Sequence, residues 1–104
     1  MERVAFKMQF KEGFEAEYKK RHDEIWPELK MLLKEAGIYD YTIFLDSQTL
    51  ALFAFQKKMD GNASNQISAD PIMRKWWDYM ADIMEVNSDN SPVCIELSEV
   101  FHLD

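Results

Sequence analysis

The sequence predicts an α+β fold with the element order β-α-β-β-α-β, the split β-α-β or ferredoxin-like arrangement. One observation is the order in which strand-like and helix-like spacings of apolar residues follow one another along the chain. Segments in which every second residue is apolar, as in half-buried strands, flank segments with apolar residues three or four apart, as in helices. The other is length, because 104 residues can build one hydrophobic core but not two. We therefore expect a single domain over residues 1–104.

The first strand is expected over residues 4–10, where apolar residues alternate with small or polar ones. A helical pattern follows over about residues 14–36, and Gly37 stands where glycine commonly ends a helix. Pro27 lies inside this pattern. Because proline has no N–H and its ring clashes with the preceding turn, we expect the helix to kink or break over residues 23–26.

The middle of the chain predicts an antiparallel hairpin. Residues 38–45 and 49–57 both alternate, and only a short polar turn, Asp46-Ser47-Gln48, separates them. In the first of these strands strict alternation places four residues on one face: Tyr39, Tyr41, Ile43 and Leu45. Residues 58–69 are the most polar part of the chain, and we expect a loop around a short helical turn there.

Asp70 and Pro71 predict the start of the second helix, since an N-cap side chain is followed by proline at the first helical position. The apolar positions of this helix are Met73, Trp76, Trp77, Met80, Ile83 and Met84. After a loop rich in Asn, Asp and Ser over residues 85–92, we expect the last strand over residues 93–103.

The strand expected over residues 49–57 indicates how copies of the chain assemble. Both faces of residues 51–55 are apolar, whereas two helices can cover only one face of a four-stranded sheet. A second copy of the chain is the cover we expect, which predicts a two-fold homodimer. A sheet that tolerates an exposed apolar face is the alternative.

Composition excludes several classes of partner. With 19 acidic and 12 basic residues, the net charge of −7 would repel a nucleic-acid backbone or an anionic membrane. No stretch approaches the roughly 20 apolar residues that span a bilayer. The single cysteine, Cys94, excludes an internal disulfide and favours a reducing compartment, so we expect a soluble, cytoplasmic protein.

Cofactors are not expected either. The chain has only three glycines and no glycine-rich loop that could cradle a phosphate. His22 and His102 are far apart, and no histidine or cysteine has the spacing of a metal-ligand set. The sequence therefore predicts neither a nucleotide cofactor nor a metal ion.

His22 is the candidate for proton transfer. It lies on the same helical face as Tyr18, four residues earlier, among apolar positions. An imidazole with a pKa of about 6.5 can give and take a proton near neutral pH, and the Tyr18 hydroxyl can donate or accept beside it. The alternative is a core histidine satisfied by one hydrogen bond.

Three further aromatic residues are candidates for a ligand site. Trp76 and Trp77 point about 100° apart on a helix, so at least one should reach a pocket, an edge or an interface. An indole can lie against the apolar face of a sugar while its N–H donates to a hydroxyl, and Tyr41 would add a second hydroxyl. The alternatives are a tryptophan in the core with the other at the dimer contact, and a structural tyrosine.

Several short motifs stand in the chain in this order: Tyr18, Arg21-His22, Ile25-Trp26-Pro27-Glu28-Leu29, Tyr41, Arg74-Lys75-Trp76-Trp77, Tyr79-Met80, Asp89-Asn90-Ser91-Pro92 and Glu99-Val100-Phe101. Together they resemble the L-rhamnose mutarotase family over essentially the whole chain. The resemblance implies a dimeric α+β barrel without a cofactor that interconverts the α and β anomers of L-rhamnose or a related 6-deoxyhexose. It also implies His22 as the proton donor and four sugar contacts: Tyr18, Tyr41, Trp76 and Trp77.

Two other functions stay open at this level. Ferredoxin-like dimers of this size also host cofactor-free oxygenases, which is an analogy of fold alone. The same aromatic residues could hold a sugar without catalysis. For a mutarotase, either Tyr18 or a bound water could accept the second proton, and the choice of sugar depends on one or two hydroxyl contacts.

Overall fold

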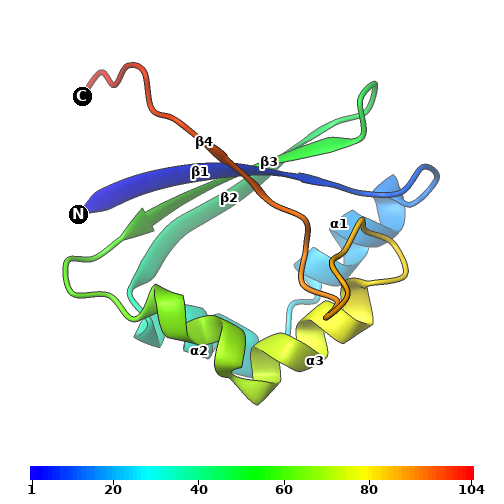
Figure 1. Ribbon diagram of the computed structural model, residues 1–104, viewed down its shortest axis with the longest axis horizontal. Helices are drawn as coiled ribbons and strands as arrows, with labels where there is room; N and C mark the ends of the chain where they lie inside the picture. The colour runs from blue at the N-terminus through cyan, green and yellow to red at the C-terminus, as the bar shows by residue number, and fades with distance from the viewer.

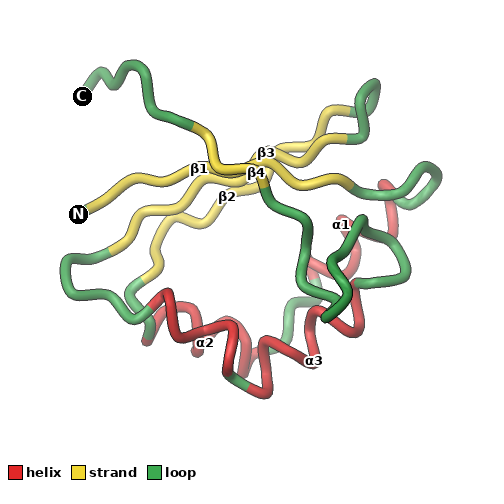
Figure 2. The backbone as a smooth tube through the Cα atoms, viewed as in Figure 1, coloured by secondary structure: helices red, strands yellow, loops and turns green.

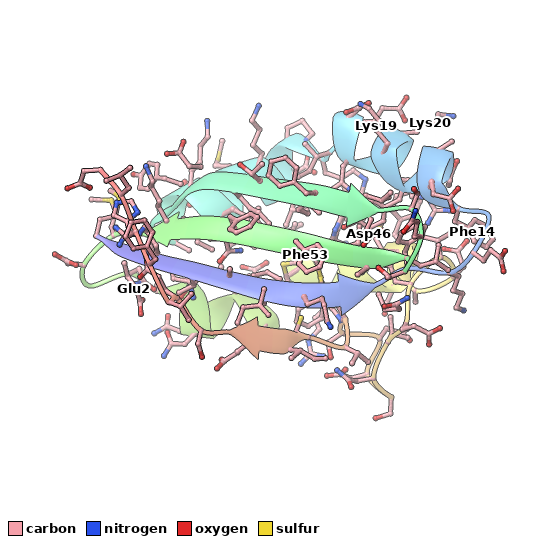
Figure 3. All side chains as sticks on the ribbon, turned by 90° about the horizontal axis from the view of Figure 1, so that it is seen from above. Glu2, Phe14, Lys19, Lys20, Asp46 and Phe53 are labelled. Carbon is pink, nitrogen blue, oxygen red and sulfur yellow. The ribbon has the colours of Figure 1, made fainter.

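The computed structural model describes residues 1–104 and consists of one curved sheet with helices against one of its faces (Figures 1 and 2). The strands are β1 (Glu2–Gln9), β2 (Ile38–Asp46), β3 (Ala51–Lys58) and β4 (Ile95–Leu97). The helices are α1 (Glu15–Asp23), α2 (Pro27–Glu35), the 3-10 helix η1 (Ser64–Ala69) and α3 (Pro71–Met80). Figure 3 looks onto the opposite face of the sheet, which no helix covers.

The sheet confirms the predicted α+β topology. Its strand order is β2-β3-β1-β4, and every neighbouring pair is antiparallel. The long strands β1 and β3 pair over eight residues at the centre. The expected last strand over residues 93–103 was too long, because only three residues, β4, pair with β1. Beyond them Glu99 bonds Arg3 through its side chain, and the C-terminal tail leaves the sheet (Figure 1).

The predicted break before Pro27 is confirmed. α1 ends at Asp23, and Pro27 is the first residue of α2, where its missing N–H costs no helical hydrogen bond. Trp26 is extended, with φ −62° and ψ 133°, as expected of a residue that precedes proline. The break separates the short helix that carries Tyr18 and His22 from the rest of the pattern.

A β-bulge in β2 corrects the expected alternation. Tyr39 pairs with Lys57 and Thr42 with Phe55, so Asp40 and Tyr41 together oppose one residue of β3. Asp40 takes the left-handed φ of +48°. The extra residue interrupts the alternation of side chains between the two faces of the sheet, so residues before and after the bulge are out of step.

Tyr39 and Tyr41 therefore do not share a face, contrary to the prediction. Ile38, only 5% exposed, takes the helix-covered side with Tyr41 and Ile43. The bulge aims Tyr41 at the interior, and the amine of Lys57 lies 3.2 Å from the Asp40 carboxylate at this point.

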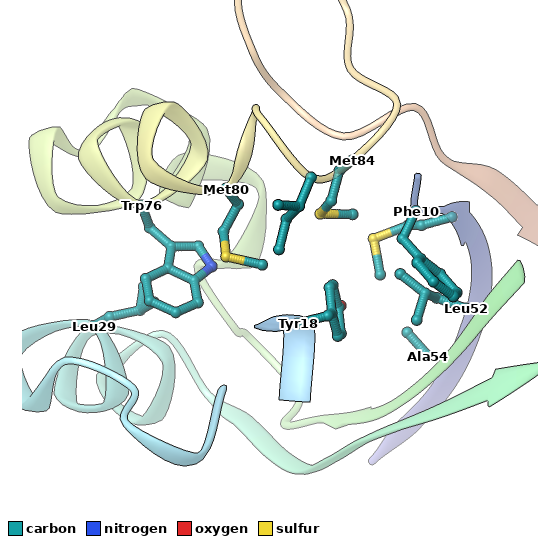
Figure 4. Close-up of a cluster of buried hydrophobic side chains, with 10 residues drawn as sticks. Phe10, Tyr18, Leu29, Leu52, Ala54, Trp76, Met80 and Met84 are labelled. Carbon is teal, nitrogen blue, oxygen red and sulfur yellow. The ribbon is translucent and has the colours of Figure 1, made fainter. Parts of the chain in front are cut away.

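The core lies between the sheet and the helices. Figure 4 shows side chains from β3, α1, α2 and α3 converging there with residues that flank β1 and α3. Asp70 caps α3 as predicted, since its carboxylate accepts from the N–H of Ile72 at 2.9 Å. Ile83 and Met84 lie beyond the end of α3, yet both remain buried as predicted apolar positions.

Replacing Ile83 by alanine should lower the free energy of unfolding by about 2–5 kcal/mol, because its fully buried side chain would leave a cavity. Denaturant unfolding measures the change. Met31→Ala is the matched control, since Met31 is 60% exposed on α2 and its loss should change stability by no more than about 0.5 kcal/mol. Equal losses in the two variants would contradict this placement of the core.

Candidate active site

A cavity of about 1260 Å³ lies under the sheet, bounded by β1, β2, β3, η1 and the three α-helices. Its lining includes all five residues singled out from the sequence: Tyr18, His22, Tyr41, Trp76 and Trp77. They come from α1, β2 and α3, which the fold brings together from distant parts of the chain. Apolar side chains such as Leu29 and Leu52 supply much of the remaining wall. The cavity therefore combines a few polar groups with an apolar floor, as small-ligand sites commonly do.

His22 and Tyr18 form one unit on α1. Their rings stack with centroids 4.3 Å apart, one helical turn from each other. The Nδ1 atom of His22 lies 3.1 Å from the carbonyl oxygen of Tyr18. A carbonyl oxygen can only accept, so Nδ1 carries the hydrogen and donates it. Nε2 is left as the ring nitrogen that can exchange a proton.

Burial controls the protonation of this pair. It lowers the pKa of His22, against the opposing effects of the Tyr18 carbonyl and Asp23. It also raises the pKa of Tyr18, and the neighbouring Tyr41 and Cys94 act in the same direction. At neutral pH the imidazole is therefore mostly neutral and the phenol keeps its proton.

The two adjacent tryptophans occupy different environments, as predicted from their angular separation on α3. Trp76 is only 6% exposed, and its ring meets His22 edge-on at 5.4 Å and Trp26 at 5.1 Å. Trp77 is half-buried, with the guanidinium of Arg74 5.4 Å from its ring centroid. Both indoles nevertheless line the cavity. Figure 4 shows Trp76 and Tyr18 in the same interior cluster of side chains.

Tyr41 lies on the inner face of β2, with its ring edge-on to Phe6 at 6.4 Å. Burial raises the pKa of Tyr41 to about 12, so its hydroxyl is also neutral. The Gln56 side chain lies beside it and favours the ionised phenol against that effect. Tyr41 thus presents a neutral hydroxyl that can donate or accept a hydrogen bond.

Gln56 was missed from the sequence. It is 9% exposed, the sole buried polar residue of the chain, and it lines the cavity on β3 in phase with Leu52 and Ala54. A polar residue in the inward phase of an otherwise apolar strand was the available signal. Its amide offers both a donor and an acceptor to whatever enters the cavity.

The other two residues considered from the sequence, Cys94 and His102, lie at the rim of the cavity or outside it. Cys94 lines the cavity, and burial raises the pKa of its thiol. His102 is not among the lining residues and bonds Asp104 in the C-terminal tail. No group of three or more His, Cys, Asp or Glu side chains is placed to hold a metal ion. None of the helices has the length and apolar character needed to cross a membrane.

Comparison with known proteins decides the family. Residues 3–103 match the L-rhamnose mutarotase family. The chain belongs to that family. Relatives named L-rhamnose mutarotase from Phocaeicola vulgatus and Bacteroides thetaiotaomicron are 61% and 60% identical, each over the full length of both chains. The crystal structure of an L-rhamnose mutarotase from Formosa agariphila superposes with a TM-score of 0.93, at 52% identity, over all of both chains.

Membership of the L-rhamnose mutarotase family confirms the resemblance inferred from the short motifs. It also confirms the expectation of an isomerase that acts on carbohydrate anomers. The fold agrees as well, because the four-stranded antiparallel sheet with helices on one face is shared with the solved structure.

The pKa of His22 should lie below about 6.5, because burial disfavours the charged imidazolium. Proton NMR titration of the ring hydrogens measures it directly. The chain has two histidines, so spectra of the His22→Gln variant assign the two sets of signals. A His22 pKa above about 6.5 would contradict the half-buried environment of its ring.

Proposed function

We propose that this cavity interconverts the α and β anomers of L-rhamnose by opening and closing the pyranose ring, with His22 as the proton donor. The observation that carries the proposal is the convergence of His22, two tyrosines and two tryptophans on one cavity in a member of this family. The substrate follows the names of the relatives, which share up to 61% of their residues with this chain.

The reaction needs two proton transfers around one sugar. In ring opening the C1–O5 bond breaks, O5 gains a proton, the hydroxyl on C1 loses one, and a C1 aldehyde forms. Rotation about the C1–C2 bond then presents the other face of the aldehyde to the O5 hydroxyl. Ring closure reverses both transfers and gives the other anomer. A positioned proton donor is typically worth about 10²–10⁴ in rate.

His22 can serve both halves of this cycle through one nitrogen. Nδ1 stays bonded to the Tyr18 carbonyl, so Nε2 is the atom that delivers a proton to O5. During closure the neutral imidazole takes the proton back from the O5 hydroxyl. Burial lowers the pKa of His22, which makes its imidazolium a stronger acid while reducing its population at neutral pH.

The second proton goes to a group other than an ionised Tyr18. Its raised pKa keeps the Tyr18 phenol protonated, so this phenol does not act as a free base at neutral pH. We assign the accepting role to a water molecule held by the Tyr18 hydroxyl. This water takes the proton of the C1 hydroxyl, and the Tyr18 hydroxyl can pass a proton on while it receives one. Tyr18 thereby contributes to binding as well as to proton movement.

The other aromatic residues bind the sugar. The faces of Trp76 and Trp77 can contact the C–H groups and the C6 methyl of a 6-deoxy sugar, since an indole joins a large apolar surface to one donor. Tyr41 and the neighbouring Gln56 offer polar atoms to the sugar hydroxyls on the sheet side of the cavity. Recognition of hydroxyls by polar groups inside a binding site is more discriminating than apolar contact.

The active assembly in this proposal is a homodimer formed through the uncovered face of the sheet. That face carries Phe44 and Phe55, which are 60% and 45% exposed and meet edge-on at 5.9 Å, and Ile95. Figure 3 shows that no helix of the same chain covers this face of the sheet. Two such sheets face to face would form the α+β barrel and remove this apolar surface from water.

His22→Gln should lower enzyme-catalysed anomer exchange by about 10²–10⁴, because it removes the proton donor. Saturation-transfer proton NMR on L-rhamnose at anomeric equilibrium measures exchange without a coupling enzyme. His102→Gln is the matched control, since His102 lies outside the cavity, and it should exchange as fast as the native chain. Sugar binding without exchange in the native chain would make the protein a binding module instead.

Phe44→Lys should convert the dimer to a monomer, because a charge on the uncovered face would be buried without a partner. Sedimentation velocity reports the change in mass. Met31→Lys introduces the same charge at a position that is equally exposed, 60%, on α2, and it should leave the dimer intact. A native chain that sediments as a monomer would overturn this part of the proposal.

A further inference from the structure

The helix that carries Tyr18 and His22 is poorly anchored by apolar packing. α1 spans nine residues, Glu15–Asp23, and Tyr18 is the only buried one among them. Its remaining positions are mostly charged, so it lacks the apolar stripe by which a short helix usually holds its place. A site that depends on the position of His22 needs another constraint on this helix.

Arg21 supplies contacts of the required kind. Its guanidinium donates to both carboxylate oxygens of Asp82, at 2.8 and 3.2 Å, and to the carbonyl oxygen of Tyr79, at 2.7 Å. It also donates to Glu17 on its own helix at 3.0 Å and lies 4.5 Å from the centroid of the Tyr79 ring. The side chain is only 11% exposed although it carries a full charge.

These contacts are more directional than an ordinary surface ion pair, although the Asp82 side chain is 64% exposed. A fork of two parallel hydrogen bonds to a carboxylate fixes direction as well as distance. The Tyr79 carbonyl lies in the last turn of α3, where carbonyl oxygens lack helical partners and attract a cation. The Asp82 pKa is lowered, chiefly by its hydrogen bond to Arg21, so the carboxylate stays charged. Lysine could not reproduce this geometry, because it has no planar fork.

Tyr79, one of the partners of Arg21, packs behind the wall of the active site, since neither Tyr79 nor Asp82 lines the cavity itself. Tyr79 packs against Trp76 at 5.7 Å and against Trp26 at 5.6 Å, and Trp76 meets His22 at 5.4 Å. Arg21 is the chain neighbour of His22. One guanidinium thus connects the helix that carries the imidazole to the end of the helix that carries both indoles.

We propose that Arg21 is a positioning residue for the reaction: its contacts with Asp82 and Tyr79 fix α1 against α3 and so fix His22 over the bound sugar. The inference rests on the proposed function for its catalytic consequence. The placement of His22 is a property of the protein alone, and it can be measured without any substrate.

The test compares Arg21→Lys and Asp82→Asn with Arg3→Lys. Arg3 also makes two hydrogen bonds to one carboxylate, both to Oε1 of Glu99 at 3.0 and 2.8 Å, but this contact joins β1 to the C-terminal tail and involves neither α1 nor α3. We expect kcat for anomer exchange to fall at least about tenfold in both Arg21→Lys and Asp82→Asn, since a displacement of about 1 Å can cost about 10²-fold. KM should change less, and Arg3→Lys should match the native chain.

A second readout is the pKa of His22, followed by NMR in the same variants. If α1 moves, His22 becomes more exposed and its pKa should rise toward about 6.5 in Arg21→Lys and Asp82→Asn only. A purely stabilising role predicts a lower melting temperature with unchanged kcat and unchanged His22 pKa in the folded variants, and that result would overturn the proposal.

If the native chain shows no exchange, the proposed function fails, while the His22 pKa still decides the role of Arg21. Should Arg21→Lys fail to fold, Asp82→Asn gives the same decision with Arg21 retained.

Discussion

The proton transfer assigned to the cavity depends on one hydrogen bond, from Nδ1 of His22 to the carbonyl oxygen of Tyr18. It determines which ring nitrogen is free and fixes the plane of the imidazole against the Tyr18 ring. Without it, either nitrogen could face the sugar, and burial alone would leave a histidine of undefined orientation. With it, Nε2 is the one atom that gives and recovers the proton of O5 in the proposed mechanism.

That hydrogen bond is useful only because three distant segments meet around it. Pro27 stops the first helix, so α1 is a short separate body that can be set at its own angle. The bulge at Asp40 turns Tyr41 inward, and the cap at Asp70 begins α3 at the position that brings Trp76 beside His22. Each of these features is local in sequence, yet together they define the cavity.

The sequence predicted much of this arrangement because its signals are local. Tyr18 and His22 are four residues apart on a helix, Pro27 requires a break, and Asp70-Pro71 marks a helix start. The bulge left no trace, since an alternating strand with one extra residue still alternates on either side of it. Strand β4 was overestimated because alternation does not reveal how far a neighbouring strand extends.

The Arg21 contacts could not be predicted either, because their partners lie 58 and 61 residues away in the chain. Charged residues on a short helix usually indicate a solvated face, so the pattern around Arg21 suggested no role. Gln56 could have been found from the sequence, because once the strand is assigned its position alternates in step with the residues that point inward. Sequence thus indicates which side chains converge more readily than it indicates what holds them in place.

In the proposed mechanism, His22 donates a proton to the ring oxygen of the sugar. The most direct test is the pH dependence of kcat/KM for anomer exchange of L-rhamnose between about pH 5 and about pH 8, the range in which histidine titrates. Donation by the imidazolium predicts a rate that falls as pH rises through the lowered pKa of His22. A rate that instead falls as pH decreases through that pKa would make His22 the acceptor in ring opening and contradict the account.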